Sequence, residues 1–124
     1  MKLGWTLLAA SLVLPAGAIA KIVDLSFAAD GQFEHAESVP AGKFLEVCGK
    51  LDRGDRVAWS FQAAAPVDFN VHYHVGEKVE YPERRSAVET LQGNFEAPLP
   101  QHFCWMWRNT GKTDVKVAAT FRKG

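Results

Sequence analysis

The stretch HFCWMWRN at positions 102–109 constrains this chain most, because its residues alternate in character with a period of two. Side chains two positions apart leave the same face of a β-strand. The aromatic face consists of Phe103, Trp105 and Trp107. The opposite face consists of His102, Cys104 and Met106. The first face can anchor a hydrophobic core, while the second offers an imidazole, a thiol sulfur and a thioether, which are donors that suit a soft metal ion.

The same period recurs through most of the chain, and most clearly at 69–75, where apolar residues alternate with Asn70, His72 and His74. We expect strands at 21–28, 35–39, 44–49, 57–62, 69–75, 78–81, 86–91, 102–108 and 115–121. The second and third long strands, 44–49 and 57–62, should form a hairpin, and 63–66 should be a loop. No helical stripe follows position 20. These features predict an all-β protein, a single antiparallel β-sandwich of GOLD-like or cupredoxin-like kind, or a small barrel.

The first twenty residues have the features of a secretory signal peptide. A basic start at Lys2 precedes an apolar run, and small residues at Ala18 and Ala20 fit an A-x-A cleavage site. The alternative is a retained amphipathic anchor. We therefore expect a signal peptide at 1–20 and one β-sandwich domain at 21–124, exported across the inner membrane to the periplasm. The run is too short to span a bilayer comfortably, so we expect no integral membrane protein.

Charge and cysteine content narrow the function further. The formal net charge is zero, and nucleic-acid binding needs a basic stripe, so we expect no nucleic-acid partner. Cys48 and Cys104 both lie in the exported part, and an even count in an oxidising compartment favours one disulfide between them. No G-x-S-x-G, H-E-x-x-H or phosphate-binding glycine loop occurs, so we expect a protein that is not an enzyme.

Four motifs together resemble a GOLD-type β-sandwich domain. They are L-x-x-G-D-x-V-x-W-x-F at 51–61, F-N-V-x-x-H at 69–74, G-x-F-x-A-P at 93–98 and F-x-W-x-W-x-N at 103–109. The resemblance covers residues 44 to 121. It implies the sandwich fold and a role in protein or lipid interaction rather than a reaction. The paired histidines and the cysteines depart from that family's pattern.

The histidine pair is the strongest chemical signal. His72 and His74 leave the same face of one strand, so both imidazoles can reach one ion; the alternative is two solvent-exposed histidines. If the strand at 102–108 is a neighbour, Met106 joins them, with His102 or Glu77 as a fourth ligand. Two imidazoles and a thioether favour copper.

Cys104 is the remaining candidate ligand beside that site. As a thiolate it could complete a blue-copper centre, but the cupredoxins carry a His shortly after the Cys and this chain has none. The disulfide is therefore the preferred interpretation of Cys104, and an electron-transfer centre is disfavoured.

Two functions follow from these patterns. The first is a periplasmic copper-binding protein for metal handling, delivery or tolerance, with copper as its cofactor. The alternative is a metal-free β-sandwich interaction module that contacts an envelope protein or a lipid.

Processing can be tested directly. The exported protein should begin at Lys21, because the A-x-A site ends at Ala20. N-terminal sequencing and intact mass of material from the periplasm will show this start. A mass that includes residues 1–20 would instead identify a retained anchor.

Overall fold

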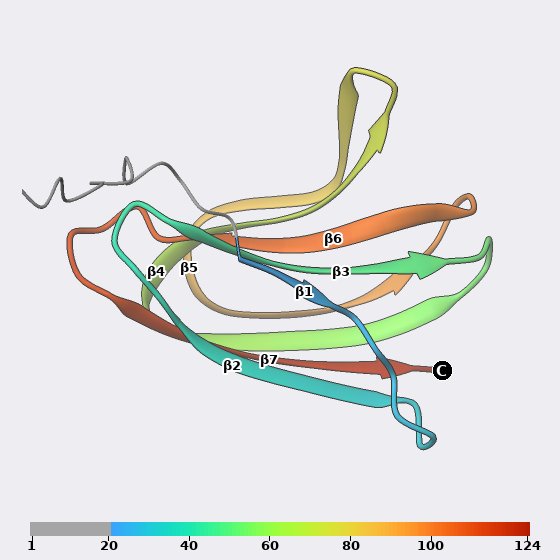
Figure 1. Cartoon of the computed structure of the whole chain (residues 1–124), viewed down its shortest axis with the longest axis horizontal. Coiled ribbons are helices and arrows are strands. Elements are labelled where there is room, and N and C mark those ends of the chain that lie inside the picture. Colours follow the sequence, from blue (N-terminus) through green and yellow to red (C-terminus); the bar gives the residue numbers. More distant parts are fainter. Residues whose placement is uncertain (1–20) are drawn as a thin grey trace, which may run out of the picture.

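The computed structural model describes residues 21–124, so the expected signal peptide lies outside the described residues. The chain forms seven strands and no helix in this range, and the prediction of an all-β domain is confirmed (Figure 1). The strands are β1 (Lys21–Asp24), β2 (Gln32–Val39), β3 (Phe44–Leu51), β4 (Arg56–Val75), β5 (Lys78–Glu96), β6 (Gln101–Arg108) and β7 (Val115–Lys123). Residues 21–124 contain no helix with the length and apolar character needed to cross a membrane.

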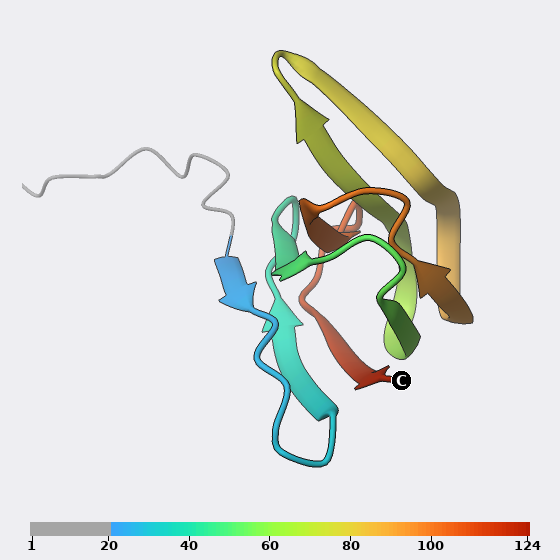
Figure 2. The ribbon, with the colours of Figure 1, turned by 90° about the vertical axis from the view of Figure 1, so that its right-hand side faces the viewer.

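The long strand β4 organises the sheet. The strand order is β1-β3-β6-β4-β7-β2, and β5 pairs with β4 along its other edge. The first half of β4 pairs with β7 and the second half with β6. Because β4 and β5 bend together between these halves, the sheet curls into two facing layers (Figures 1 and 2).

The bend explains why the loop predicted at 63–66 was wrong. These residues, Ala-Ala-Ala-Pro, lie inside β4, and the register with β5 shifts between Gln62 and Val67. A proline has no N–H for the ladder and is tolerated at a bulge, and small alanines leave room for the strand to bend. Turn-like composition at this place therefore marks a bend within a strand.

The hairpin predicted between 44–49 and 57–62 was also wrong. β3 pairs with β6 in antiparallel fashion and with β1 in parallel fashion, whereas it has no pairing with β4. The turn between β3 and β4 instead carries the chain from one layer to the other. Asp55 holds this turn, since its carboxylate accepts a 2.8 Å hydrogen bond from the Asp52 N–H, which lowers the pKa of Asp55.

The remaining expected strands are present with different ends. β2 begins earlier than expected, and β1 ends before 28, although the Leu25 N–H still donates to the Cys48 carbonyl at 2.7 Å. The segments expected at 78–81 and 86–91 are parts of the single strand β5. The strands expected at 102–108 and 115–121 are confirmed as β6 and β7.

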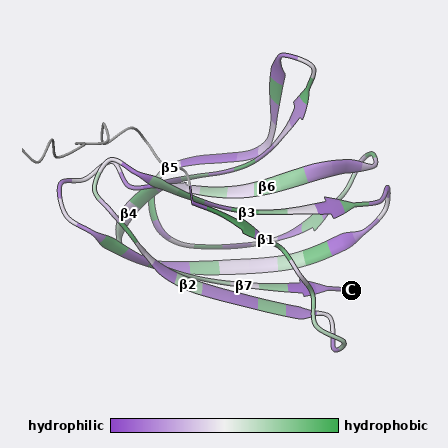
Figure 3. Cartoon of the chain, viewed as in Figure 1, coloured by the Kyte–Doolittle hydropathy of each residue, from purple (hydrophilic) through white to green (hydrophobic). Residues whose placement is uncertain are grey.

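The core lies between the two layers and is rich in aromatic rings. Rings from opposite layers meet with centroids 5.7 Å apart for Phe61 and Trp107, 5.5 Å for Phe95 and Trp105, and 5.3 Å for Trp105 and Phe121. All six residues expected in the core are buried: Trp59, Phe69, Val71, Phe103, Trp105 and Val117. Bands of hydrophobic and hydrophilic residues alternate along β2, as expected for a strand with one face toward solvent (Figure 3).

The predicted disulfide is present. Cys48 in β3 and Cys104 in β6 lie directly opposite each other, and their sulfurs are bonded. The bond lies on the outer face of the layer, because the neighbouring side chains of Val47, Phe103 and Trp105 are buried in the core. By closing a long loop it contributes on the order of 4 kcal/mol to the free energy of unfolding.

The two faces of β6 predict very different effects of truncation. Trp105→Ala should lower the free energy of unfolding by about 3–5 kcal/mol, because it empties a fully buried site. Met106→Ala, on the opposite face of the same strand, should lower it by about 1 kcal/mol or less. Urea denaturation of both variants checks this, and equal losses would contradict the assignment of faces.

Candidate functional site

The outer face of the β4–β6 pair carries the residues expected to bind a metal. Asn70 lies opposite Met106, and His72 lies opposite Cys104. The neighbouring strands that the proposed ligand set requires are therefore present. On the far side of β6, Met106 lies opposite Glu46 of β3, so four strands contribute to one surface.

His72 is enclosed by two acceptor oxygens. It is only 5% exposed, with Nδ1 2.7 Å from Oδ1 of Asn70 and Nε2 3.2 Å from Oε1 of Glu46. Both ring nitrogens therefore already face an oxygen of a neighbouring side chain. Ligation of a metal at His72 would require Glu46 or Asn70 to move.

One group of three residues in 21–124 places metal-ligand atoms together, with Glu46, His72 and Cys104 all within 4.8 Å. The sulfur of Cys104 is bonded to Cys48 and cannot act as a thiolate. The group is therefore a carboxylate and an imidazole in close contact beside a disulfide. Glu46 was not among the residues expected at this site. Its position between the apolar residues Leu45 and Val47 nevertheless indicates a side chain that points outward.

The other expected ligands are dispersed over this face. The ring of His74 is exposed and lies with its centroid 5.3 Å from that of His72. Met106 is half-buried and pairs with Asn70 rather than with either histidine. His102 is exposed near the start of β6, and Glu77 lies in the exposed turn after β4. The copper site thus stays a prediction. Of its expected ligands, His72 and His74 lie close together.

A hairpin formed by the end of β4 and the start of β5 projects beyond the rest of the sheet (Figures 1 and 2). The pairing of β4 with β6 ends at His72, whereas its pairing with β5 continues to Val75 and Lys78. Val75 is 50% exposed and Tyr81 is 42% exposed. Within residues 21–124 only one other large hydrophobic side chain is that exposed, namely Ile22 in β1.

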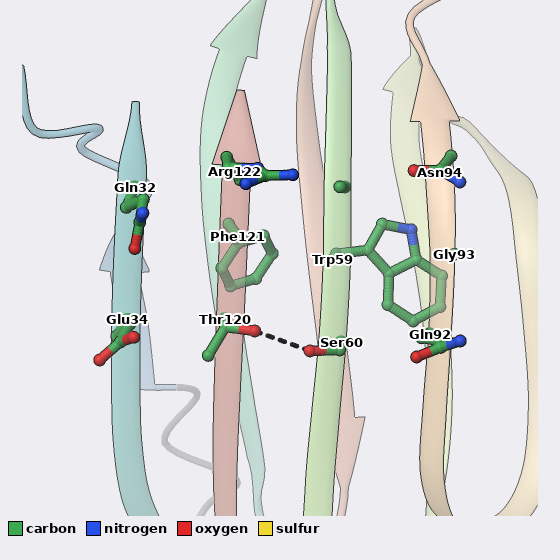
Figure 4. A pocket seen from close by; sticks show the side chains of 11 residues that line it. Gln32, Glu34, Trp59, Ser60, Gln92, Gly93, Asn94, Thr120, Phe121 and Arg122 are labelled. Atoms are coloured by element: carbon green, nitrogen blue, oxygen red, sulfur yellow. Dashed lines mark hydrogen bonds between the residues drawn. The ribbon is translucent and has the colours of Figure 1, made fainter. Parts of the chain in front are cut away.

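A hollow lies on the other layer, across β2, β7, β4 and β5 (Figure 4). Its floor includes Ser60 and Thr120, whose hydroxyls are 2.7 Å apart, and its sides include the amides of Gln92 and Asn94. The lining has no histidine and no exposed large hydrophobic side chain. His72, His74, Val75 and Tyr81 lie in the other part of the sheet, beyond the bend of β4.

No protein-family model matches the chain, and no curated protein matches its sequence. Solved structures match its fold. The Aeromonas hydrophila protein PliG, a periplasmic lysozyme inhibitor of g-type lysozyme, is 12% identical with a TM-score of 0.64, over 85% of this chain and 97% of that one. Salmonella Typhimurium PliG, named in the same words, is 13% identical with a TM-score of 0.61, over 84% and 98%. A mitogen from Yersinia pseudotuberculosis is 10% identical with a TM-score of 0.57, over 73% and 84%.

These identities are low, so the likeness shows the fold alone. The same curled β-architecture serves an inhibitor in two of these proteins and a mitogen in the third. The resemblance to GOLD-type domains stays a prediction, because none of these structures bears that name.

The metal prediction has a direct measurement. If copper binds as predicted, dialysed protein should retain one equivalent, and His72→Ala, His74→Ala and Met106→Leu should each reduce it. The variant His35→Ala, which removes a half-buried histidine of β2 away from this face, provides the control. Metal analysis of the dialysed samples decides the matter: no retained copper in the wild-type protein would exclude the site.

Proposed function

We propose that this protein is a periplasmic protein-binding module that contacts an envelope protein through the projecting hairpin. The observation that carries the proposal is the pair of exposed side chains, Val75 and Tyr81, on an element that extends away from the body of the fold. The two side chains leave opposite faces of the hairpin, because Val75 lies opposite Lys78 while Tyr81 lies beside the ring of His72. A partner that encloses the hairpin would therefore bury both of them.

The composition of the hairpin supports a protein partner. Charged residues surround the two hydrophobic side chains: Glu77, Lys78, Glu80, Glu83 and Arg84. A hydrophobic centre with a polar rim is the usual arrangement of a protein interface. Acidic and basic residues are mixed along this segment, whereas a surface that binds anionic lipid would carry clustered basic residues alone.

The same surface favours this function over copper handling. His72 is already enclosed by Asn70 and Glu46, and Cys104 is oxidised. Glu77, one of the two residues expected as a fourth ligand, lies at the hairpin end instead of beside the histidines.

The structural neighbours suggest a location and a first partner to test. Two of them are periplasmic inhibitors of g-type lysozyme. A protein with this fold and an expected signal peptide fits the same compartment. We therefore choose g-type lysozyme as the first candidate partner, and inhibition of its activity as the first functional readout.

Binding to g-type lysozyme should depend on the hairpin. Val75→Ser/Tyr81→Ser should weaken binding at least tenfold, equivalent to about 1.4 kcal/mol, because it removes the hydrophobic centre of the contact. The variant should melt at the wild-type temperature, since both side chains are exposed. Biosensor titration, lysozyme activity and thermal melting measure the three quantities.

Ile22→Ser is the matched control, because Ile22 is equally exposed but lies in β1. It should bind like the wild-type protein. To extend the test to other envelope proteins, a photo-crosslinker at position 81 is compared with one at position 22 in periplasmic extracts. Equal capture at both positions, or binding of lipid vesicles in place of protein, would contradict the proposal.

A further inference from the structure

We propose that a hollow at the base of the hairpin binds a carboxylate group on the protein partner. The hollow lies between β5 and β6, across the second half of β4, and has a volume of about 340 Å³. Its polar and cationic lining residues are Asp68, Asn70, Arg84, Arg85, Ser86 and Arg108. This inference rests on the proposed function, in that it takes the partner to be a protein.

The sheet register places two arginines on either side of β4. Arg84 of β5 lies opposite Asn70, and Arg108 of β6 lies opposite Asp68. Asn70 and Asp68 are two positions apart and leave the same outer face. The two guanidinium groups therefore border one hollow from neighbouring strands.

Neither of these arginines is neutralised by a carboxylate within residues 21–124. The guanidinium of Arg84 lies 4.4 Å from the ring centroid of Tyr81, and that of Arg108 lies 5.7 Å from the ring centroid of Phe44. Contact with an aromatic face positions a guanidinium while leaving its N–H groups free to donate. Arg85, by contrast, is paired with Glu83 at 2.8 Å.

The backbone at the edge of the hollow is held in an uncommon conformation. Ala87 has φ of 54°, the one positive value among non-glycine residues 21–124, and its N–H donates to Oδ1 of Asp68 at 3.0 Å. An alanine in the left-handed region is strained unless its surroundings hold it there. The bond from Ala87 to Asp68 thus fixes the preceding residues, Arg84 to Ser86, at the edge of the hollow.

The side chain of Asn70 is held in place by its contact with His72. Oδ1 of Asn70 is engaged with Nδ1 of His72, and the other imidazole nitrogen is held by Glu46. The NH2 group of Asn70 has no partner among the described residues, so it remains available as a donor at the hollow. The buried Glu46–His72 pair is accordingly a positioning device for a binding residue.

The charges favour a carboxylate over a phosphate. Two unpaired guanidinium groups attract an anion, and their planar forks match the two oxygens of a carboxylate. The carboxylate of Asp68 also lines the hollow, so a dianionic phosphate would meet repulsion that a singly charged group meets less. Tyr81 lines the hollow and is also exposed on the hairpin, which joins this site to the proposed protein contact.

The first test uses a small probe and needs no partner. N-acetyl-glutamate amide is titrated into the protein while NMR follows the arginine Nε–Hε signals. The signals of Arg84 and Arg108 should shift, and that of Arg122, on the other layer, should not. The neutral analogue N-acetyl-glutamine amide should cause no shift. In Arg84→Gln the remaining Arg108 signal should shift at least threefold less, and in Arg108→Gln the remaining Arg84 signal should do the same. In Asn70→Ala the shifts of both arginine signals should require at least threefold more probe.

Three results would overturn the inference. The first is an equal response of Arg122, which would mean unspecific ion pairing. The second is an equal response to the neutral analogue. The third is inorganic phosphate binding at least tenfold more tightly than the glutamate probe, which would identify a phosphate site instead.

The second test uses g-type lysozyme. Arg84→Gln/Arg108→Gln should weaken its binding at least tenfold and reduce its dependence on salt, whereas Arg122→Gln should change it less than twofold. If lysozyme does not bind at all but the probe does, the choice of partner fails and the carboxylate site stands. If lysozyme binds both variants equally, the site fails and the proposed function stands.

Discussion

The bend in β4 is the feature on which the rest of the structure depends. A single strand supplies aromatic side chains to both layers, and the rings of its two halves meet in the core. The centroid of Phe69 lies 4.9 Å from that of Trp59 and 4.8 Å from that of Phe61. Because side chains from the two halves of β4 pack against each other across the bend, the two layers can separate only if β4 straightens and this packing is lost.

The bend also determines what lies on the outside. The first half of β4 pairs with β7, and the second half pairs with β6, so the two outer faces have different neighbours. One outer face becomes a polar surface of hydroxyl and amide groups (Figure 4). The other gathers Glu46, His72 and the disulfide, and it continues into the projecting hairpin.

Sequence periodicity predicted the core correctly because side-chain direction along a strand is a local property. Trp105 and Val117 are buried as expected, and His72 and Met106 leave the opposite faces of their strands. Strand pairing was predicted less well. It is a property of the whole topology, and the expected hairpin after 44–49 assumed that strands adjacent in sequence also pair. Likewise, composition at 63–66 could not distinguish a loop from a bend.

The candidate site, too, was predicted from local patterns and only as far as these reach. The sequence placed His72 and His74 on one face, but it gave no sign that Glu46 and Asn70 would cover both nitrogens of His72. That arrangement requires β3, β6 and β4 to lie in a particular order. The arginines bordering the hollow were missed for the same reason, since Arg84 and Arg108 are brought together only by their separate pairing with β4.

The buried pair of Glu46 and His72 is not explained by stability alone. Burying an imidazole and a carboxylate requires removing both from water, and such pairs are often no more stabilising than well-packed hydrophobic residues. Apolar side chains would fill the same place beside the disulfide. Polar contacts from Glu46 to His72 and from His72 to Asn70 instead connect side chains of β3 and β4 across β6, and they hold the side chain of Asn70 in position. The retained polarity therefore has its structural effect at the surface, where the amide of Asn70 meets the hollow.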